Sequence, residues 1–494
     1  MRRALDTVVV FLLLPSVLAF TPLPAVDLAI GARGVATNDS TCLAIQQAIS
    51  SASSVYYPSD PQYSQDIWHF MNSSIQYPKC TVEPGTVQDV SKIMKILANS
   101  TSPFAVKCGG HASNQGFSST TGVLIAMTRF NKVIYHPETS TADIPTGVIW
   151  DDVYAALEPH GVNVVGGRVS GVGATGVTLG GGYSWLTNLY GLTVDSVTAF
   201  ELVLPSGEVV EVTNDNKFRD LFFALKGGFN NFGIVTKFTL TTYPQGQIWA
   251  GLILYSGSHW DKLADATVDF QNSNTDPNAN VLPSFNQYPN GTQVAAVLVF
   301  YNKPTAPPGL FDKFLNVPSI SQNVTTRSFR DFILSIPSNA EAGFRGAFKG
   351  VSLAEFSPGI LKTILAEIPT WSAYNGANSG VFVSYDMEPF LTSIPKHATP
   401  SAFPHDKFAS PMNIYFAWTS PDSDGAQMQG IEQTAANIAA AAKAEGQDID
   451  SLTLYPNYCL ADTPLEKMYG NNVQRLKSIK EEYDPLNVMG RTGG

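Results

Sequence analysis

A short glycine turn that leads into a histidine constrains this chain more than any other feature. The apolar stretch Phe104-Ala105-Val106 predicts a strand, and Gly109-Gly110-His111 follows it closely. Glycine allows positive φ and a close approach of the backbone to a ligand, and successive N–H groups in such a turn form a concave site for a phosphate. We therefore predict an anion-binding loop with His111 at its rim. The alternative, on these residues alone, is an ordinary tight turn with a surface histidine.

Three further stretches follow in the sequence and give this turn its context. They are the glycine-rich run 166–183, which ends in Gly180-Gly181-Gly182-Tyr183; residues 225–236, which contain two more glycine motifs; and the C-terminal Asn457-Tyr458, followed by 469–472 and 483–487. In this order the motifs resemble the vanillyl-alcohol-oxidase and berberine-bridge-enzyme-like flavoproteins. The resemblance implies an α+β fold, in which a two-part PCMH-type FAD-binding domain is joined to a substrate domain with an antiparallel sheet backed by helices.

Length and pattern predict how these domains divide the chain, because 494 residues exceed one ordinary core. The hydrophobic pattern of the sequence changes after about residue 246. Strands with alternating apolar residues are predicted there, such as 294–300 and 412–418, together with a helical stretch at 431–444. The expected order is a signal peptide at 1–19, an N-terminal leader with one helix at 20–75, the FAD-binding domain at 76–246, the substrate-binding domain at 247–445, and a berberine-bridge-like segment at 446–494 that returns to the FAD domain.

The N-terminus predicts secretion. Arg2 and Arg3 precede an apolar run from Val8 to Phe20, which is too short to span a bilayer and which ends in small residues suited to cleavage after Ala19. Five sequons give this leader a consistent context for a secreted glycoprotein. Their asparagines are Asn38, Asn72, Asn99, Asn290 and Asn323. We expect an extracellular protein with no membrane association once the signal peptide is removed.

Charge and composition restrict the partners. The formal net charge of -11 is spread along the chain, which argues against nucleic acid and anionic membranes as partners. The histidines show no metal-ligand spacing, so we predict no metal site. The expected partners are a small-molecule substrate and O2, and we expect a monomer. The four cysteines allow three full pairings; the resemblance pairs Cys42 with Cys80 and leaves Cys108 and Cys459 as buried free thiols near the flavin.

The resemblance implies FAD attached by a single covalent bond through His111. A neutral imidazole nitrogen is nucleophilic near neutral pH, which suits attack on the flavin 8α carbon. A second bond is not expected, because Val169 stands where many relatives carry a cysteine, and Lys107 keeps the positive charge where an arginine is common. The cofactor-binding residues implied are His111 with Lys107, Cys108, Gly109, Gly110, Ala112, Gly116, Phe117, Val169, Val172, Gly173, Gly176, Gly180, Gly182, Tyr183, Ile234, Val235 and Asn457. Val172 is also the implied oxygen-gating residue, and the alternative for it is a simple core valine.

Gly171-Val172-Gly173-Ala174-Thr175-Gly176 also matches the G-x-G-x-x-G fingerprint of dinucleotide-binding folds. That fingerprint requires a helix that opens at the third glycine, and the triplet Gly180-Gly181-Gly182 argues against such a helix here. We interpret the stretch as a glycine-lined loop against a flavin.

Tyr458 matches the active-site tyrosine of the family and is the expected catalytic base. A free phenol has a pKa of about 10, so this role requires a lowered pKa or a proton relay. The alternative is a buried tyrosine that packs on the flavin. Asp386 and Glu388 lie in a strand that could face the site, where they would bind substrate or relay the proton; the alternative is that both are solvated charges at a sheet edge.

The leading functional hypothesis is a secreted oxidase that transfers a hydride from an alcohol, carbohydrate or secondary metabolite to FAD, which O2 reoxidises to give H2O2. One alternative is an oxidative cyclase of secondary metabolism, and another is a dehydrogenase with an acceptor other than O2. A flavin-binding protein with little turnover is the alternative from outside the enzymes.

Overall fold

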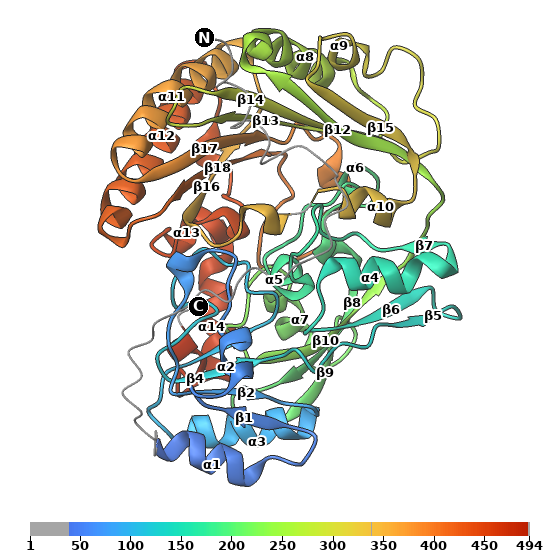
Figure 1. The fold of residues 1–494 in the computed structure, drawn as a ribbon. Coiled ribbons are helices and arrows are strands. Elements are labelled where there is room, and N and C mark those ends of the chain that lie inside the picture. Colours follow the sequence, from blue (N-terminus) through green and yellow to red (C-terminus); the bar gives the residue numbers. More distant parts are fainter. Residues whose placement is uncertain (1–38, 337, 493–494) are drawn as a thin grey trace. The chain divides into compact units, whose positions relative to one another are not determined.

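The computed structural model describes residues 39–336 and 338–492, so the signal peptide expected at 1–19 and the sequon at Asn38 lie outside the described residues. Ser40–Gly494 form one compact unit, to which all elements below belong. Three sheets of four, five and seven strands organise this unit, together with a two-stranded ladder. Figure 1 shows them in chain order.

The first sheet is mixed and has the strand order β1-β2-β4-β3, in which β2, β4 and β3 run parallel. Helix α3 packs on it through residues at helical spacing, among them Val90, Ile93 and Leu97, which are fully buried in the same core as the strands. The disulfide that the resemblance implied joins Cys42 to Cys80. Cys108 and Cys459 are free thiols; Cys459 is buried as expected, whereas Cys108 is only half-buried. The elements are α1 (Ser40–Ala48), β1 (Ser54–Tyr56), α2 (Pro61–Asp66), β2 (Cys80–Glu83), α3 (Val87–Ala98), β3 (Phe104–Lys107) and β4 (Val123–Ala126).

The second sheet is antiparallel, with the order β5-β6-β10-β8-β9. Its strands share a core with the helices of the glycine-rich region, and that core also takes up the apolar side chains at the start of the next sheet. The elements of this part of the chain are β5 (Ile134–His136), β6 (Thr141–Pro145), α4 (Trp150–Leu157), β7 (Val162–Asn163), α5 (Ala174–Leu179), α6 (Thr187–Tyr190), β8 (Val197–Val203), β9 (Val209–Thr213), α7 (Arg219–Leu225), β10 (Ile234–Thr241) and β11 (Tyr243–Pro244). Of these, β7 and β11 pair with each other in the two-stranded ladder.

The third sheet has seven antiparallel strands in the order β15-β12-β14-β13-β17-β18-β16. Helices α11 and α12 lie on one of its faces (Figure 1), where alternate side chains such as Tyr385 and Ile414 are buried. The expected antiparallel sheet backed by helices is therefore present. The elements are β12 (Ile248–Ser256), α8 (Trp260–Ser273), β13 (Ala279–Gln287), β14 (Gln293–Tyr301), α9 (Asp312–Leu315), β15 (Ser321–Arg327), α10 (Phe329–Leu334), β16 (Arg345–Leu353), α11 (Pro358–Ala377), β17 (Gly380–Met387), β18 (Ser410–Trp418) and α12 (Asp424–Ala444).

The C-terminal segment packs back against the first sheet. After α13 (Leu465–Tyr469) and α14 (Val473–Tyr483), Asp484 accepts hydrogen bonds from the backbone N–H groups of Val488 and Met489, both at 2.8 Å. Those two side chains join the buried core around α3, and Arg491 Nη2 donates to Leu97 O at 2.8 Å. No helix in the described part of the chain is long and apolar enough to cross a membrane.

Two local expectations were wrong. The leader contains a second helix, α2, and a strand, β1, because Pro61 starts α2 and residues 54–56 pair with β2. A helix also opens at Gly173, where we had expected none. This helix, α5, has only six residues and ends at Leu179, so the glycine triplet lies beyond its last turn and does not oppose it. The loop before α5 is not a strand, and the βαβ unit of a dinucleotide fold is absent here.

Candidate functional site

The two glycine-rich stretches found in the sequence touch each other through their backbones. A Cβ placed on Gly109 would lie 2.5 Å from Cα of Gly173, and one on Gly173 would lie 2.7 Å from N of Gly109. No side chain fits between them, so only glycine permits this contact. The neighbouring Gly110 has φ +71°, which turns the chain from β3 toward His111. The contact fixes the histidine turn against the start of α5.

The other two motifs join the same region. Asn457, in the 3₁₀ turn η9 (Pro456–Tyr458), donates from Nδ2 to Val177 O at 3.2 Å and lies against Gly180. Residues 226–236 approach from the other side, where the backbone N–H of Phe229 donates to Leu179 O at 3.1 Å and the ring of Phe229 packs on Phe117. The structure therefore gathers the glycine turn, the glycine run, the loop before β10 and Asn457-Tyr458.

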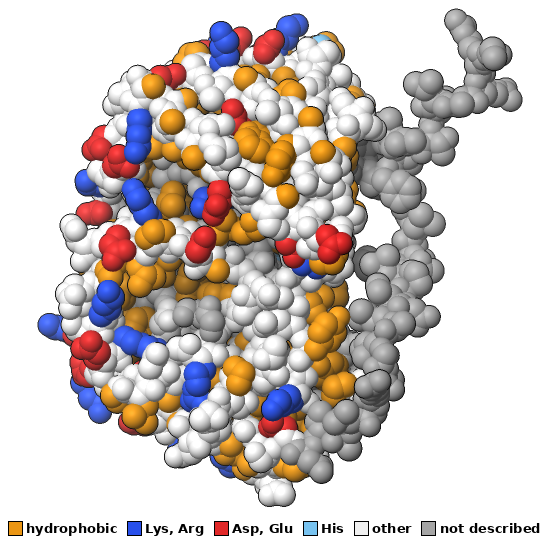
Figure 2. Space-filling model, turned by 90° about the vertical axis from the view of Figure 1, so that its left-hand side faces the viewer, with side chains coloured by type: hydrophobic (Ala, Val, Ile, Leu, Met, Phe, Trp, Pro, Cys, Tyr) orange, Lys and Arg blue, Asp and Glu red, His pale blue; other side chains and the backbone are white. Residues whose placement is uncertain are grey.

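This region has the form that a bound FAD requires. Two of its glycines border open space: a Cβ at Gly116 or at Gly176 would meet no atom within 4 Å. Glycine-lined turns with free N–H groups can accept the anionic and flat parts of the cofactor. Figure 2 shows one face of the molecule hollowed near its middle, with hydrophobic side chains around the hollow. The residues that would hold FAD are thus those of the histidine turn and of the run from 171 to 182.

The surroundings of His111 favour a neutral imidazole. Its ring stacks on Phe70, with the centroids 4.1 Å apart and the planes at 14°, and its Nε2 lies 3.3 Å from Ser338 Oγ. Burial lowers the pKa of His111 to about 4, so the ring is uncharged at neutral pH. Nucleophilic attack by a ring nitrogen requires this form.

Lys107 lies at the end of β3, and its side chain is only 5% exposed. Burial lowers its pKa, while the charge of Asp66 acts in the opposite direction. The pKa of Asp66 is itself raised to about 6 by burial, and that of His69 is lowered to about 4 by burial and then by Lys107. The positive charge of Lys107, which is close to the glycine turn in the sequence, is therefore buried.

Tyr458 lies at the centre of a small charged cluster with Glu388 and Arg168. The Tyr458 hydroxyl donates to Glu388 Oε1 at 2.7 Å and accepts from Arg168 Nη2 at 2.8 Å. The same guanidinium nitrogen donates to Glu388 Oε1 at 2.7 Å. Arg168 Nη1 is 2.7 Å from Glu388 Oε2 in a charge contact that lies off the hydrogen-bonding direction. Glu388 is almost fully buried, so the solvated alternative is wrong for it.

The electrostatics of this cluster favour a relay over a phenolate. Burial raises the pKa of Tyr458 well above its usual value and Glu388 raises it further, while Arg168 acts against both. Tyr458 is therefore a neutral hydrogen-bond donor in the resting protein. Of the two options that the sequence left open, the direction of the pKa shift argues against a lowered pKa, and the Tyr458 hydroxyl donates to a carboxylate, Glu388, as a relay would require.

Asp386 lies in β17, as expected, whereas Glu388 follows the last residue of that strand, Met387, and is not part of it. The two carboxylates have different partners. Asp386 Oδ1 accepts from Ser284 Oγ at 2.5 Å and from Ser384 Oγ at 2.7 Å, and its Oδ2 accepts from Asn413 Nδ2 at 3.2 Å. Burial raises the pKa of Asp386 in spite of these donors. It is half-buried in the middle of the sheet and is not a solvated edge charge.

The remaining expected residues lie close by, but few of them make a contact that assigns a role. Val172 packs against the core next to α5, and its carbonyl accepts from Trp150 N at 3.0 Å. Val169 and Ala112 are half-buried in their loops, and Tyr183 stacks on Phe390. Ile234 and Val235 open β10 and are buried.

Sequence reasoning missed Arg168, although a signal was available. Arg168 is the only Asp, Glu, Lys or Arg between residues 161 and 194. A charge inside a stretch expected to be buried requires a partner of opposite charge. The partner is 220 residues away in the chain, so no local pattern could have named it. Ser338, Phe70 and Asn413 were missed as well, and no motif marks them.

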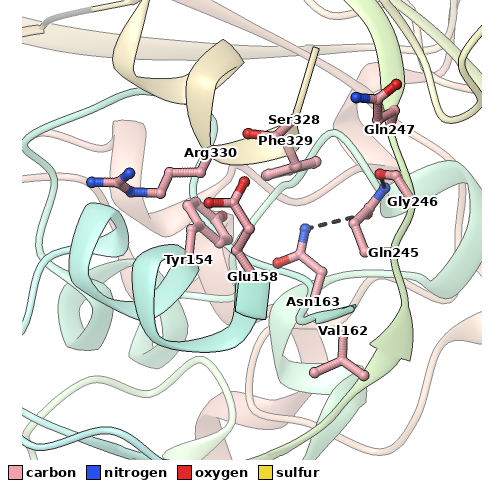
Figure 3. Close-up of a pocket in the computed structure, with 10 residues that line it drawn as sticks. All are labelled: Tyr154, Glu158, Val162, Asn163, Gln245, Gly246, Gln247, Ser328, Phe329 and Arg330. Carbon is pink, nitrogen blue, oxygen red and sulfur yellow. Dashed lines mark hydrogen bonds between the residues drawn. The ribbon is translucent and has the colours of Figure 1, made fainter. Parts of the chain in front are cut away.

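A separate cavity of about 260 Å³ lies beside the end of α4 (Figure 3). Its wall includes Asn163, which donates to Gln245 Oε1 at 3.3 Å, as the dashed line in Figure 3 shows. The lining residues are Tyr154, Glu158, Val162, Asn163, Gln245, Gly246, Gln247, Ser328, Phe329 and Arg330. None of the expected flavin residues lines this cavity, so it is not the flavin site. Within the described ranges, no group of three His, Cys, Asp or Glu side chains could hold a metal.

Comparisons with known proteins support the same assignment. Residues 78–213 match the model of an FAD binding domain, and residues 454–490 match the model described as berberine and berberine like. An FAD-dependent monooxygenase of Arthrobotrys oligospora is 30% identical, over 92% of this chain and 88% of its own length. An FAD-dependent monooxygenase of Aspergillus calidoustus is 31% identical, over 83% of this chain and 80% of its own.

A solved structure confirms the fold. The wild-type BBE-like 1 protein of Physcomitrella patens superposes with a TM-score of 0.75, covering 91% of this chain and 97% of that one at 22% identity. The PCMH-type FAD-binding fold and the order of motifs expected from the sequence are therefore both found. The chain belongs to the berberine-bridge-enzyme-like family of FAD-dependent oxidoreductases.

Proposed function

We propose that this protein is a secreted oxidase that takes a hydride from a C–H bond of an organic substrate such as an alcohol, a carbohydrate or a secondary metabolite. Bound FAD supplies the two-electron acceptance and passes the electrons to O2, which forms H2O2. The observation that carries the proposal is the Tyr458 hydroxyl, held between a buried carboxylate and a largely buried guanidinium. A protein that only carried flavin would have no need for this arrangement.

Tyr458 and Glu388 form a proton path for this reaction. As the substrate hydroxyl gives its proton to Tyr458 Oη, the phenolic proton passes to Glu388 Oε1, 2.7 Å away. The phenol therefore does not need to ionise first, which agrees with its raised pKa. Arg168 holds both oxygens through one nitrogen and supplies positive charge beside the group that loses its proton.

His111 provides the proposed single covalent attachment of FAD. Its lowered pKa gives the neutral ring nitrogen that must attack the flavin. No sulfur nucleophile stands at position 169, which argues for one bond only. The proposed role of Val172 is to leave O2 a path to the flavin.

The covalent attachment can be tested on a denaturing gel. Flavin fluorescence should migrate with the wild-type protein and be absent from His111→Ala, whose flavin should be released by acid precipitation. Mass spectrometry should place the adduct on the His111 peptide alone. Free flavin from the denatured wild type, or an adduct on Cys108 or Cys459, would contradict this part of the proposal.

Removal of the Tyr458 hydroxyl tests the catalytic part. Tyr458→Phe keeps the ring, so flavin content and folding should be unchanged. Flavin reduction, measured by anaerobic stopped flow with a substrate found by peroxide screening, should slow by about 10²–10⁴-fold. Tyr385→Phe is the matched control, because Tyr385 is also buried but donates or accepts at Thr434 on the helix-covered face of the sheet. An unchanged reduction rate in Tyr458→Phe would assign the base to another group.

Monooxygenation is the second candidate, because two relatives that cover most of this chain are named FAD-dependent monooxygenases. Stoichiometry separates the two reactions. An oxidase releases one H2O2 for each substrate oxidised and leaves no oxygen from O2 in the product. A monooxygenase inserts labelled oxygen from ¹⁸O2. An oxidative cyclase would release H2O2 with a new ring in the product, and a dehydrogenase would be reoxidised by an added quinone rather than by O2.

Secretion and glycosylation remain part of this proposal. The four sequon asparagines in the described residues, at positions 72, 99, 290 and 323, are all exposed, so none is sterically closed to a glycan. Endoglycosidase treatment of the protein recovered from culture medium would remove any glycans and lower its apparent mass.

A further inference from the structure

A row of polar side chains crosses the third sheet next to Tyr458. Asp386 of β17 lies opposite Asn413 of β18 on one side and opposite Ser284 of β13 on the other. Asn413 in turn lies opposite Gly350 of β16, whose Cβ, if it had one, would be 3.0 Å from Tyr458 Cβ. Residues directly opposite one another in a sheet point to the same face. This row therefore faces away from α11 and α12 and toward Tyr458.

The row contains a carboxylate without a basic partner. The three groups that donate to Asp386 are two hydroxyls and one amide, all neutral. Among the described residues, no Lys, Arg or His forms an ion pair with Asp386 or with Glu341. Glu341, at the end of the 3₁₀ turn η5 (Ser338–Glu341), is close enough for the charge of Asp386 to raise its pKa. Two acidic side chains thus share this region.

Two buried polar atoms in the same region lack a hydrogen-bond partner among the residues that the structure describes. Asn413 Oδ1 and the Tyr415 hydroxyl have none, although their residues are only 6% and 5% exposed. The Asn413 amide is oriented by its donation to Asp386, so its free oxygen adjoins the carboxylate. Tyr415 is within electrostatic reach of Glu341. An unsatisfied buried acceptor costs free energy unless a ligand supplies the missing donor.

Aromatic rings border these acceptors. Tyr415 packs against Phe348 and Phe382, with centroids 4.9 and 5.0 Å away, and more loosely against Phe70, which stacks on His111. Aromatic faces beside carboxylates form an environment that suits an organic cation, since the ring faces and the acids attract the same charge. The aromatic rings and the acids also extend toward the proposed flavin-bearing histidine.

We propose that the substrate carries a protonated amine, which Asp386 binds while Asn413 Oδ1 accepts one of its N–H groups, with Glu341 as a second acidic side chain of the same region. This inference rests on the proposed function, because it assigns the substrate to the site of Tyr458. Asp386, in β17, and Glu388, just past the end of that strand, share no hydrogen-bond partner among the described residues. The ammonium group is therefore distinct from the carbon that is oxidised beside Tyr458 and serves to hold the substrate.

The test measures binding rather than turnover, on the flavin-loaded Tyr458→Phe protein. Titration of the flavin absorbance under anaerobic conditions compares two pairs of probes that differ mainly in charge: benzylamine with benzyl alcohol, and tryptamine with tryptophol. Each amine should bind at least about tenfold more tightly than its alcohol, because hydrogen bonds to charged groups are the stronger kind. Added Asp386→Asn should weaken amine binding by about 10- to 100-fold and change alcohol binding by less than about twofold.

Two further variants keep this result interpretable. Glu341→Gln removes the second carboxyl without touching the row and should also weaken amine binding, so the inference is still tested if the Asp386 variant folds poorly. Asp265→Asn, on the exposed side of α8, removes the same charge far from the row and should leave both affinities unchanged.

Amines that bind no more tightly than their alcohols, or not at all, would overturn the inference. So would an amine preference that survives both carboxyl variants. Because binding is read from the flavin and not from catalysis, the preference can be found even if Tyr458 proves not to be the base. Conversely, loss of turnover in Tyr458→Phe without any amine preference would uphold the oxidase proposal and reject this inference alone.

Discussion

The two carboxylates near the C-terminal end of β17 are separated by one residue, Asp386 within the strand and Glu388 just after its last residue, and they have opposite surroundings. Glu388 is held by a guanidinium and a phenol, and its charge is matched within the protein. Asp386 is held by two serines and an asparagine, and no basic side chain in the described residues pairs with it. A matched charge can take part in proton transfer without a ligand, whereas an unmatched charge is available to bind one. In the two proposals above, Glu388 is therefore the group that would move a proton and Asp386 the group that would recognise substrate.

The largest effect on stability should follow from removing Arg168, the cation that pairs with Glu388. Arg168→Met leaves Glu388 buried and unpaired, which should lower the free energy of unfolding by about 3–5 kcal/mol, measured by urea denaturation of the flavin-loaded protein. The double variant Arg168→Met/Glu388→Leu should recover most of that loss, because it removes the stranded charge as well. Lys443→Met, which breaks the exposed pair with Asp450, is the control and should have far less effect. Equal losses in the single and double variants would mean that the Arg168–Glu388 pair is not the source of the stability.

A smaller effect on stability, which depends on pH, should come from Glu341, the acidic side chain near Asp386. Burial, and then the charge of Asp386, raise the pKa of Glu341 from 4.5 to about 7, and Tyr288 and Tyr415 are the other titratable groups in its reach. Between these two values the unfolded chain has lost the proton and the folded protein still holds it. Stability should therefore fall as pH rises through this window, by about 1–3 kcal/mol after allowance for the partial exposure of Glu341.

Glu341→Gln should flatten that dependence, so that urea midpoints measured across the window change less than those of the wild type. The same slope in both proteins would show that Glu341 titrates as it does in the unfolded chain.

The smallest effect should come from one neutral donor. Ser284→Ala removes one of the three hydrogen bonds to Asp386 and leaves those of Ser384 and Asn413. The expected loss is about 0.5–1.5 kcal/mol in unfolding free energy, the usual net contribution of a hydrogen bond. A loss as large as that of Arg168→Met would mean that the serine supports Asp386 as strongly as the arginine supports Glu388, and the contrast between the two carboxylates would disappear.

The sequence by itself determined the features that local pattern can carry. The glycines at 109 and 110 permit the turn that holds His111, and alternation along residues 412–418 gave the buried strand β18. The family motifs added the Cys42–Cys80 pairing and the position of Tyr458. These properties depend on φ/ψ preferences, on periodicity and on short motifs, all of which can be read within a few residues.

Only the tertiary structure decided what the charged residues do. Asp386 and Glu388 look alike in the sequence, where both fall in one predicted strand, although β17 ends between them at Met387. Their difference comes from Arg168, which lies 220 residues before Glu388, and from Ser284, which lies 102 residues before Asp386. Strand order and register bring these partners together, and neither is encoded near the carboxylates. The energy of a buried charge depends on the groups that surround it in space, so the two roles could not be separated until the sheet had been assembled.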